Sequence, residues 1–221
     1  MKEMLQLKPD LLLHKRLKSL SLSILVGMTL VCLLTLLGWA TGSEILKYPV
    51  SGTVAMNPLT AISFLALIIS FYIQVNATVK KVLRYISWVL TVLIVTIVLW
   101  KLSSLIFDFR FSLDQQMFSK AIQNEKVDGF ANSMAPNTAF SFVVCGITVL
   151  FYNAKLNALR IAVQSAVVVC LLLSVFSLLG YLFGATEFYE VKKFIPMAPV
   201  TAVCFFLFGL SILFAAPGKG I

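Results

Sequence analysis

The chain has 221 residues, of which 60% are apolar and only 12% are charged, about half the charged fraction of an average soluble domain. This composition excludes an ordinary cytosolic protein. The formal net charge of +9 would suggest nucleic acid as the partner of a soluble protein, but in a membrane protein it is first a topology signal. The expected partner is therefore the lipid bilayer and not nucleic acid.

The chain begins with a basic stretch, residues 1–19, which we expect to be a cytoplasmic amphipathic segment lying on the anionic leaflet. The apolar run that follows reaches Trp39 without a small-residue cleavage site, and it is too long for the core of a signal peptide. It is predicted to be a retained first helix.

Six apolar runs of near spanning length follow one another along the chain. They predict an all-α, polytopic membrane protein whose six transmembrane helices are arranged as three repeated helical hairpins. The hairpins cover residues 20–75, 87–152 and 161–216, which together make a membrane domain over residues 20–216, and residues 217–221 form a cytoplasmic exit. The runs are Leu20–Ala40, Pro58–Val75, Ser87–Phe107, Pro136–Tyr152, Ile161–Phe183 and Pro199–Ala216.

Basic residues divide unevenly between the two sides of such a bundle. The side of the N-terminus holds eleven Lys and Arg with two acids, whereas the other side holds six with seven acids. Since basic loops stay in the cytoplasm, both termini are predicted to be cytoplasmic. Lys101 lies in the third run near its outer end, where it can reach the headgroups. In the longest outer connection, residues 108–135, the polar stretch 123–133 has the spacing of a short amphipathic helix.

A short motif opens the second, fourth and sixth runs. It consists of Met, with Pro two residues later, Thr four, Ala five and Phe eight residues later, and these positions match in all three copies. The repetition indicates duplication of one helical hairpin. The candidate site residues are the Met, Pro and Thr of each copy: Met56, Pro58, Thr60, Met134, Pro136, Thr138, Met197, Pro199 and Thr201.

Two interpretations of the motif remain open. In the first it is architectural: Pro starts the helix, where its missing N–H would have no partner, Thr and Ala allow close packing, and Met and Phe fill the core. In the second, three helix N-termini open toward the outer side around a pseudo-threefold axis, and the motif residues line a ligand pocket. Three thioethers would suit Cu(I), but no Cys or His stands beside them, so a metal site is not expected.

Groups for chemistry inside the membrane are scarce. The four cysteines lie in apolar runs without CxxC spacing, so disulfides and zinc are not expected, and the one histidine, His14, precedes the first run. No acid stands at the centre of a run, and no P-loop or nucleophile–base pair is present. The sequence therefore indicates neither an enzyme nor a proton-coupled transporter, and it identifies no cofactor.

Several stretches carry a family resemblance: Leu-Gly-Tyr-Leu-Phe-Gly at residues 179–184, Met-Ala-Pro-Val-Thr-Ala-Val-Cys-Phe-Phe-Leu-Phe-Gly-Leu-Ser-Ile-Leu at 197–213, Pro-Gly-Lys-Gly at 217–220, and Met-Ala-Pro-Asn-Thr-Ala at 134–139. Together they resemble the N-terminal integral-membrane sensor regions of bacterial sensor histidine kinases, and similar regions precede PAS and diguanylate-cyclase modules. The resemblance covers nearly all of the chain from Leu20 onward.

The resemblance implies a bacterial inner-membrane location and a cytoplasmic signalling module, joined in cis or supplied by a partner protein, with a homodimer as a further option. Two departures stand against it. The 221 residues contain no phosphoacceptor His, ATP-binding motif or cyclase motif, and Ile68 stands where the other two copies have Gly146 and Gly209.

The leading hypothesis is a membrane-integral sensory module of a two-component or related bacterial signalling protein, which relays an outer-side or intramembrane cue through its last helix. The alternative is a non-catalytic structural or assembly subunit of a membrane complex, in which the motif serves packing alone. A small transporter or channel is the third hypothesis.

Overall fold

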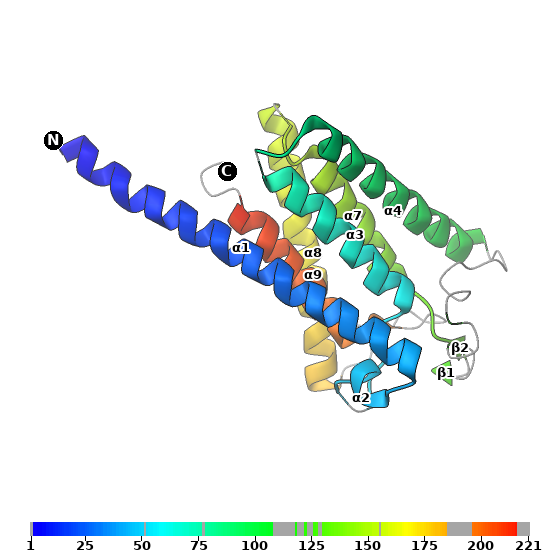
Figure 1. The fold of residues 1–221 in the computed structure, drawn as a ribbon. Helices are drawn as coiled ribbons and strands as arrows, with labels where there is room; N and C mark the ends of the chain where they lie inside the picture. Colours follow the sequence, from blue (N-terminus) through cyan, green and yellow to red (C-terminus); the bar gives the residue numbers. More distant parts are fainter. Residues whose placement is uncertain are drawn as a thin grey trace.

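The structure, a computed structural model, describes residues 2–50, 52–76, 78–107, 118, 122, 126–127, 130–154, 156–184 and 196–215. These residues form seven helices and one small antiparallel sheet (Figure 1). The helices are α1 (Lys2–Thr41), α2 (Glu44–Lys47), α3 (Pro58–Val75), α4 (Lys81–Phe107), α7 (Pro136–Phe151), α8 (Asn157–Phe183) and α9 (Pro199–Ala215), and the strands are β1 (Lys126–Val127) and β2 (Phe130–Ala131).

Four of the helices have the length and apolar composition needed to cross a bilayer. The candidate spans are Leu12–Thr41, Pro58–Val75, Lys81–Ser104 and Ile161–Phe183. The apolar helices α7 and α9 are shorter, with 16 and 17 residues, which correspond to about 24 and 26 Å. These lengths and compositions are those of a helical membrane protein.

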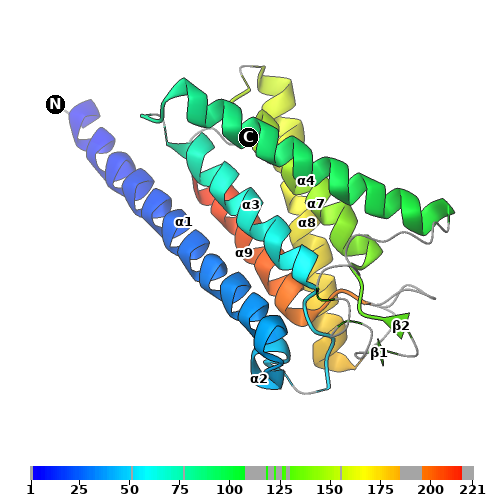
Figure 2. The ribbon, with the colours of Figure 1, turned by 45° about the vertical axis from the view of Figure 1, so that its right-hand side comes forward.

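The helices form two layers, with α3, α7 and α9 inside and α1, α4 and α8 outside. Each outer helix packs against two inner ones: α1 against α3 and α9, α4 against α3 and α7, and α8 against α7 and α9, while the inner three also contact one another. In α3 the apolar window is 67% buried, against 22–28% in the three long outer helices. The first and last of these six helices, α1 and α9, therefore lie side by side and close the bundle (Figure 2).

The buried stripe of each outer helix has the same spacing. Counting from its first member, the stripe recurs at 4, 7, 11, 14 and 17 residues, a helical period that keeps one face toward the core. Large apolar side chains on the other face, such as Val26, Tyr85 and Leu172, are exposed, as lipid-facing residues would be. The stripes are Ser21, Leu25, Met28, Cys32, Thr35 and Gly38 in α1; Ser87, Thr91, Ile94, Val98, Lys101 and Ser104 in α4; and Val163, Val167, Cys170, Ser174, Ser177 and Gly180 in α8.

A serine pair joins the consecutive helices α3 and α4 near the end of the bundle that holds the start of α4. Ser70 of α3 and Ser87 of α4 each donate to the other's carbonyl oxygen, at 3.3 and 3.0 Å. Such hydroxyl bonds satisfy polar groups between apolar helices and allow close approach of the backbones. Ser87 also accepts from Gln74, whose side-chain and backbone oxygens accept from Asn153 after α7.

Glycines set the approach of two inner helices to their partners. A Cβ at Gly146 would collide with the Val95 side chain of α4, and one at Gly209 would lie 2.7 Å from Leu171 Cδ2 of α8. The residue at the equivalent place in α3 is Ile68, which is buried. The neighbouring helices approach so closely at Gly146 and Gly209 that only a residue without a side chain fits there.

Several expectations about the elements need correction. The described part of the stretch 123–133 includes an antiparallel pair, with Lys126 opposite Ala131 and Val127 opposite Phe130, so the predicted amphipathic helix there was wrong. The sequence between the strands is Asp-Gly, a pair favoured in two-residue hairpin loops. Most of the rest of that loop lies outside the described residues. The predicted exit at 217–221 lies wholly outside them.

The N-terminal segment also differs from the expectation. Residues 2–19 belong to α1, which has 40 residues and a length of about 60 Å, twice the hydrocarbon thickness of about 30 Å. In Figure 1 the N-terminal part of α1 continues the helix axis beyond the rest of the bundle. It therefore extends the first span along its axis and does not turn to follow a surface. Helices α4 and α8 likewise begin six and four residues before the apolar runs Ser87–Phe107 and Ile161–Phe183.

Candidate functional site

The three motif phenylalanines meet at the centre of the bundle. The ring centroids of Phe64 and Phe142 lie 4.7 Å apart, those of Phe64 and Phe205 4.6 Å, and those of Phe142 and Phe205 4.8 Å. All three side chains are fully buried, and the tilted rings have the geometry that aromatic pairs favour. The sequence repeat thus corresponds to three side chains in mutual contact.

The three copies of the motif start their helices in the same way. Pro58, Pro136 and Pro199 are the first residues of α3, α7 and α9, as predicted. The N–H of the motif Ala then donates to the carbonyl of the residue before Pro, at 3.1 Å in α3, 2.9 Å in α7 and 3.0 Å in α9. These bonds complete the first turn of each helix.

The candidate site residues are packed into the interior. The three Met and the three Thr side chains are buried, Pro58 is buried, and Pro136 and Pro199 are half-buried. This is the arrangement expected if the motif serves packing. The ligand pocket predicted for these residues stays a prediction.

A polar cluster where α3 and α7 begin was not anticipated from the sequence. Asn57 caps α3 by accepting from the Leu59 N–H at 2.9 Å, and its amide donates to Asn132 Oδ1 at 3.1 Å. Asn132 in turn donates to the Ala55 carbonyl at 3.0 Å, and both asparagines are buried. The cluster fastens the segment before α7 to the segment before α3.

An aromatic and cationic cap covers the first motif copy. The Trp39 indole N–H donates to the Met56 carbonyl at 2.8 Å, and both residues are buried. The Lys47 ammonium lies 5.3 Å from the Trp39 ring centroid and 5.7 Å from that of Tyr48, within cation–π range. The only sequence signal for this cap is the aromatic residue that follows Gly38 at the end of the first run.

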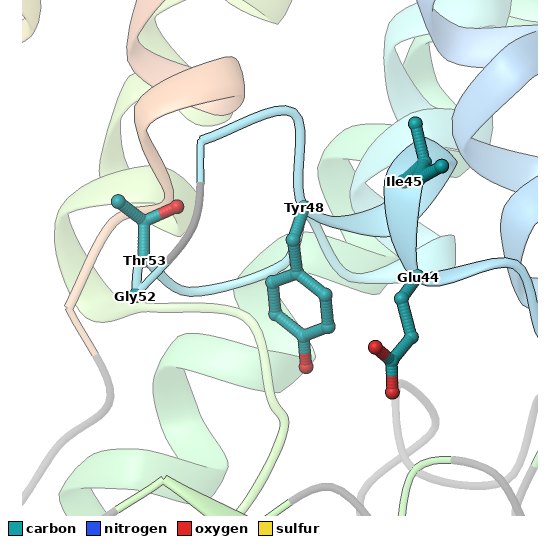
Figure 3. A pocket seen from close by; sticks show the side chains of 5 residues that line it. All are labelled: Glu44, Ile45, Tyr48, Gly52 and Thr53. Atoms are coloured by element: carbon teal, nitrogen blue, oxygen red, sulfur yellow. The ribbon is translucent and has the colours of Figure 1, made fainter.

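A pocket of about 440 Å³ opens beside α2, between this helix and the loop before α3. Figure 3 shows Glu44 and Tyr48 extending in the same direction, with Thr53 on the other side of Tyr48. None of these residues belongs to the repeated motif or to the candidate site predicted from the sequence. The described lining residues are Glu44, Ile45, Tyr48, Gly52 and Thr53.

Lys101 lies elsewhere than expected. Its position is on the buried stripe of α4, equivalent to Thr35 in α1 and Ser177 in α8, and only 6% of its surface is exposed. The Lys101 side chain is therefore covered by protein, whereas the expectation was that it would reach the lipid headgroups.

The four cysteines are free and buried, and one of them, Cys170, donates to the Ser141 carbonyl at 3.8 Å. They contribute to helix packing as small apolar residues.

The fold and these sites define a helical bundle, four of whose helices are long and apolar enough to span a membrane, with an aromatic centre and a polar cap where α3 and α7 begin. Comparisons of the chain with models of protein families, with curated proteins and with solved structures gave no match in any of the three. The resemblance to sensor regions of histidine kinases accordingly stays a prediction from the sequence.

Proposed function

We propose that the chain is a membrane-integral sensory module of a bacterial signalling protein, located in the inner membrane with both termini in the cytoplasm. In this proposal six helices span the bilayer as three repeated hairpins, α1 with α3, α4 with α7 and α8 with α9. The equal stripe spacing of the outer helices and the matching starts of the inner ones support the repeat. Helices α7 and α9 are preceded by the buried pairs Met134–Ala135 and Met197–Ala198, which extend the buried depth of each.

The observation that carries the proposal is a continuous set of contacts from the outer cap to the last helix. Trp39 of the cap bonds to Met56, which precedes α3, and Phe64 of α3 touches Phe205 of α9. If a change in the cap moved α3, the contact between Phe64 and Phe205 would transmit the movement directly to α9. The relay would be a shift or rotation of α9 between two packings of the central rings, biased by a ligand that contacts them differently.

The aromatic centre weighs against a channel along the bundle axis. The rings of Phe64, Phe142 and Phe205 touch one another there. Further along α3 and α9, the ring centroids of Phe71 and Phe208 lie 5.7 Å apart. A solute moving along the axis would have to displace these rings. A transporter or channel is therefore third among the candidate functions.

The alternative of a structural or assembly subunit is favoured by the burial of the motif. If packing is the whole purpose of the motif, the module senses nothing and presents only its outer helices to a partner. Purification from native membranes separates the two: a stoichiometric complex with another membrane protein would support the subunit.

The test is a chimera in which a cytoplasmic histidine-kinase module is joined after Ile221. The variant Phe205→Ala removes a ring from the centre, whereas Val203→Ala changes an exposed side chain on the same helix. We expect Phe205→Ala to change autophosphorylation in membranes while Val203→Ala does not, at equal amounts of inserted protein. Equal output from both variants, and from a chimera with all three motif Thr residues replaced by Val, would refute the relay.

A further inference from the structure

Two of the described side chains that line the pocket beside α2, those of Glu44 and Thr53, present hydrogen-bond acceptors. Glu44 is exposed, and its ionised carboxylate only accepts. The Thr53 hydroxyl donates its proton to the Val50 carbonyl at 2.8 Å, so that its lone pairs are what remain for a ligand. A ligand rich in N–H donors would complement this lining.

Among the described lining residues, the charged one is Glu44. Lys47 is the nearest described cation in sequence, but it is buried, lies over the Trp39 and Tyr48 rings and is not among the described lining residues. Of the described residues, the Glu44 carboxylate is therefore the charged group that a ligand meets. An ammonium group offers both the opposite charge and several donors, and hydrogen bonds between ionised partners are about twice as strong as neutral ones.

The same pocket also has an apolar part. Ile45 has 82% of its surface exposed, and the Tyr48 ring forms the wall between Glu44 and Thr53 (Figure 3). A volume of about 440 Å³ is within the range of small-molecule sites. The ligand that fits is thus a small molecule with an ammonium group attached to an apolar body.

We propose that this pocket binds a small organic amine in its protonated form. The inference rests on the proposed sensory function and names the chemical class of the outer-side cue. Thr53 stands three residues before Met56, whose carbonyl accepts the Trp39 bond. Binding between α2 and this loop would consequently act on the segment that leads into α3.

The test is equilibrium binding to the full chain reconstituted in nanodiscs, measured by calorimetry with the signal of empty nanodiscs subtracted. The probe is benzylammonium, and benzyl alcohol is its neutral counterpart of the same shape. We expect saturable binding of the amine, with the alcohol weaker by about tenfold or more. Equal affinity for the two probes, or no saturable amine binding below about 10 mM, would overturn the proposal.

Variants locate the site. Glu44→Gln keeps the size of the side chain and is expected to weaken amine binding by about tenfold or more, and Thr53→Val by severalfold. The matched control is Thr41→Val, since the Thr41 hydroxyl also donates to a backbone carbonyl, that of Leu37, at 2.8 Å but lies on α1. Unchanged affinity in Glu44→Gln, with unfolding temperature equal to wild type, would refute the assignment.

The binding experiment is independent of signalling output. If the kinase chimera responds to Phe205→Ala and yet the pocket binds no amine, the inference fails while the proposed function stands. If the amine binds as expected and the chimera gives the same output in every variant, the sensory function fails while the binding site stands.

Discussion

Ser21 and Ser211, 190 residues apart in the chain, each donate a hydrogen bond to the other's backbone carbonyl. The two distances are 2.9 Å and 3.2 Å, and the hydroxyl oxygens themselves lie 2.8 Å apart. This reciprocal pair joins α1 to α9 in the way that Ser70 and Ser87 join α3 to α4. Between α7 and α8 the corresponding residues are Thr148, which donates to Val144 of its own helix, and Val163.

The Ser21–Ser211 pair should stabilise the bundle measurably. We expect Ser21→Ala to lower the free energy of unfolding by about 0.5–1.5 kcal/mol, the range found for hydrogen bonds between membrane helices. The double variant with Ser211→Ala should cost less than the sum of the two single changes, because both remove the same interaction. Unfolding in detergent micelles measures it. Ser23→Ala, an exposed position on α1, is the control, and strict additivity would contradict the pairing.

The central rings should dominate stability. Replacing Phe142 by Ala removes a fully buried ring from contact with two others, and we expect a loss of about 3–5 kcal/mol. The control is Phe140→Ala, two residues away on α7, where the ring is 47% exposed. Thermal unfolding of the two variants in the same detergent checks the prediction. If they lose equal stability, Phe142 does not lie at the centre.

Gly146 should tolerate no side chain. A Cβ there would collide with the Val95 side chain, so Gly146→Ala is expected to destabilise the protein by about 1–3 kcal/mol. Combining it with Val95→Ala should restore part of the loss, because the smaller residue makes room. Gly27→Ala is the control, since nothing lies within 4 Å of its added methyl group, and its unfolding temperature should stay the same or rise. Absence of rescue by Val95→Ala would argue against the contact.

The stability that the cluster of Asn57 and Asn132 provides should depend on both residues. Asn57→Ala removes the cap of α3 and leaves Asn132 without one partner, with an expected cost of about 1–3 kcal/mol. Asn57→Asp keeps the acceptor for the Leu59 N–H but replaces the donor to Asn132 by an oxygen. It should therefore recover only part of the loss. Asn57→Ala places the same residue before Pro58 that α7 and α9 have before their first proline, Ala135 and Ala198. Wild-type stability of this variant would show that the cluster is dispensable.

The helix starts could be anticipated from the sequence because they depend on local spacing: Pro at the first helical position fixes where α3, α7 and α9 begin. The motif phenylalanines were predicted to fill the core under the packing interpretation, whereas their contact with one another depends on how the three helices pack. Which face of each outer helix is buried could not be anticipated. In a bilayer both faces are apolar, so the serines and threonines of the buried stripes do not stand out by hydropathy.

Other features required knowledge of tertiary structure or were misread. The strand pair of residues 126–127 and 130–131 flanks the sequence Asp-Gly, a pair favoured in hairpin loops, but the polar residues around it were interpreted as helical. The buried position of Lys101 follows from its place in the α4 stripe, which is visible only once α4 is aligned with α1 and α8. The pocket beside α2 is formed by a four-residue helix and a loop, neither of which has a periodic sequence pattern.

The joining of α1 to α9 has a consequence for biosynthesis. The ribosome adds Ser21 to the chain 190 residues before Ser211, so the Ser21 hydroxyl lacks this partner until α9 has been made and has entered the membrane. The contact between Ser70 and Ser87, by contrast, can form as soon as the two neighbouring helices have been inserted. Completion of the bundle is therefore expected to depend on its last-made helix, and an insertion intermediate halted before α9 would offer the open flank of α1 to chaperones and membrane proteases.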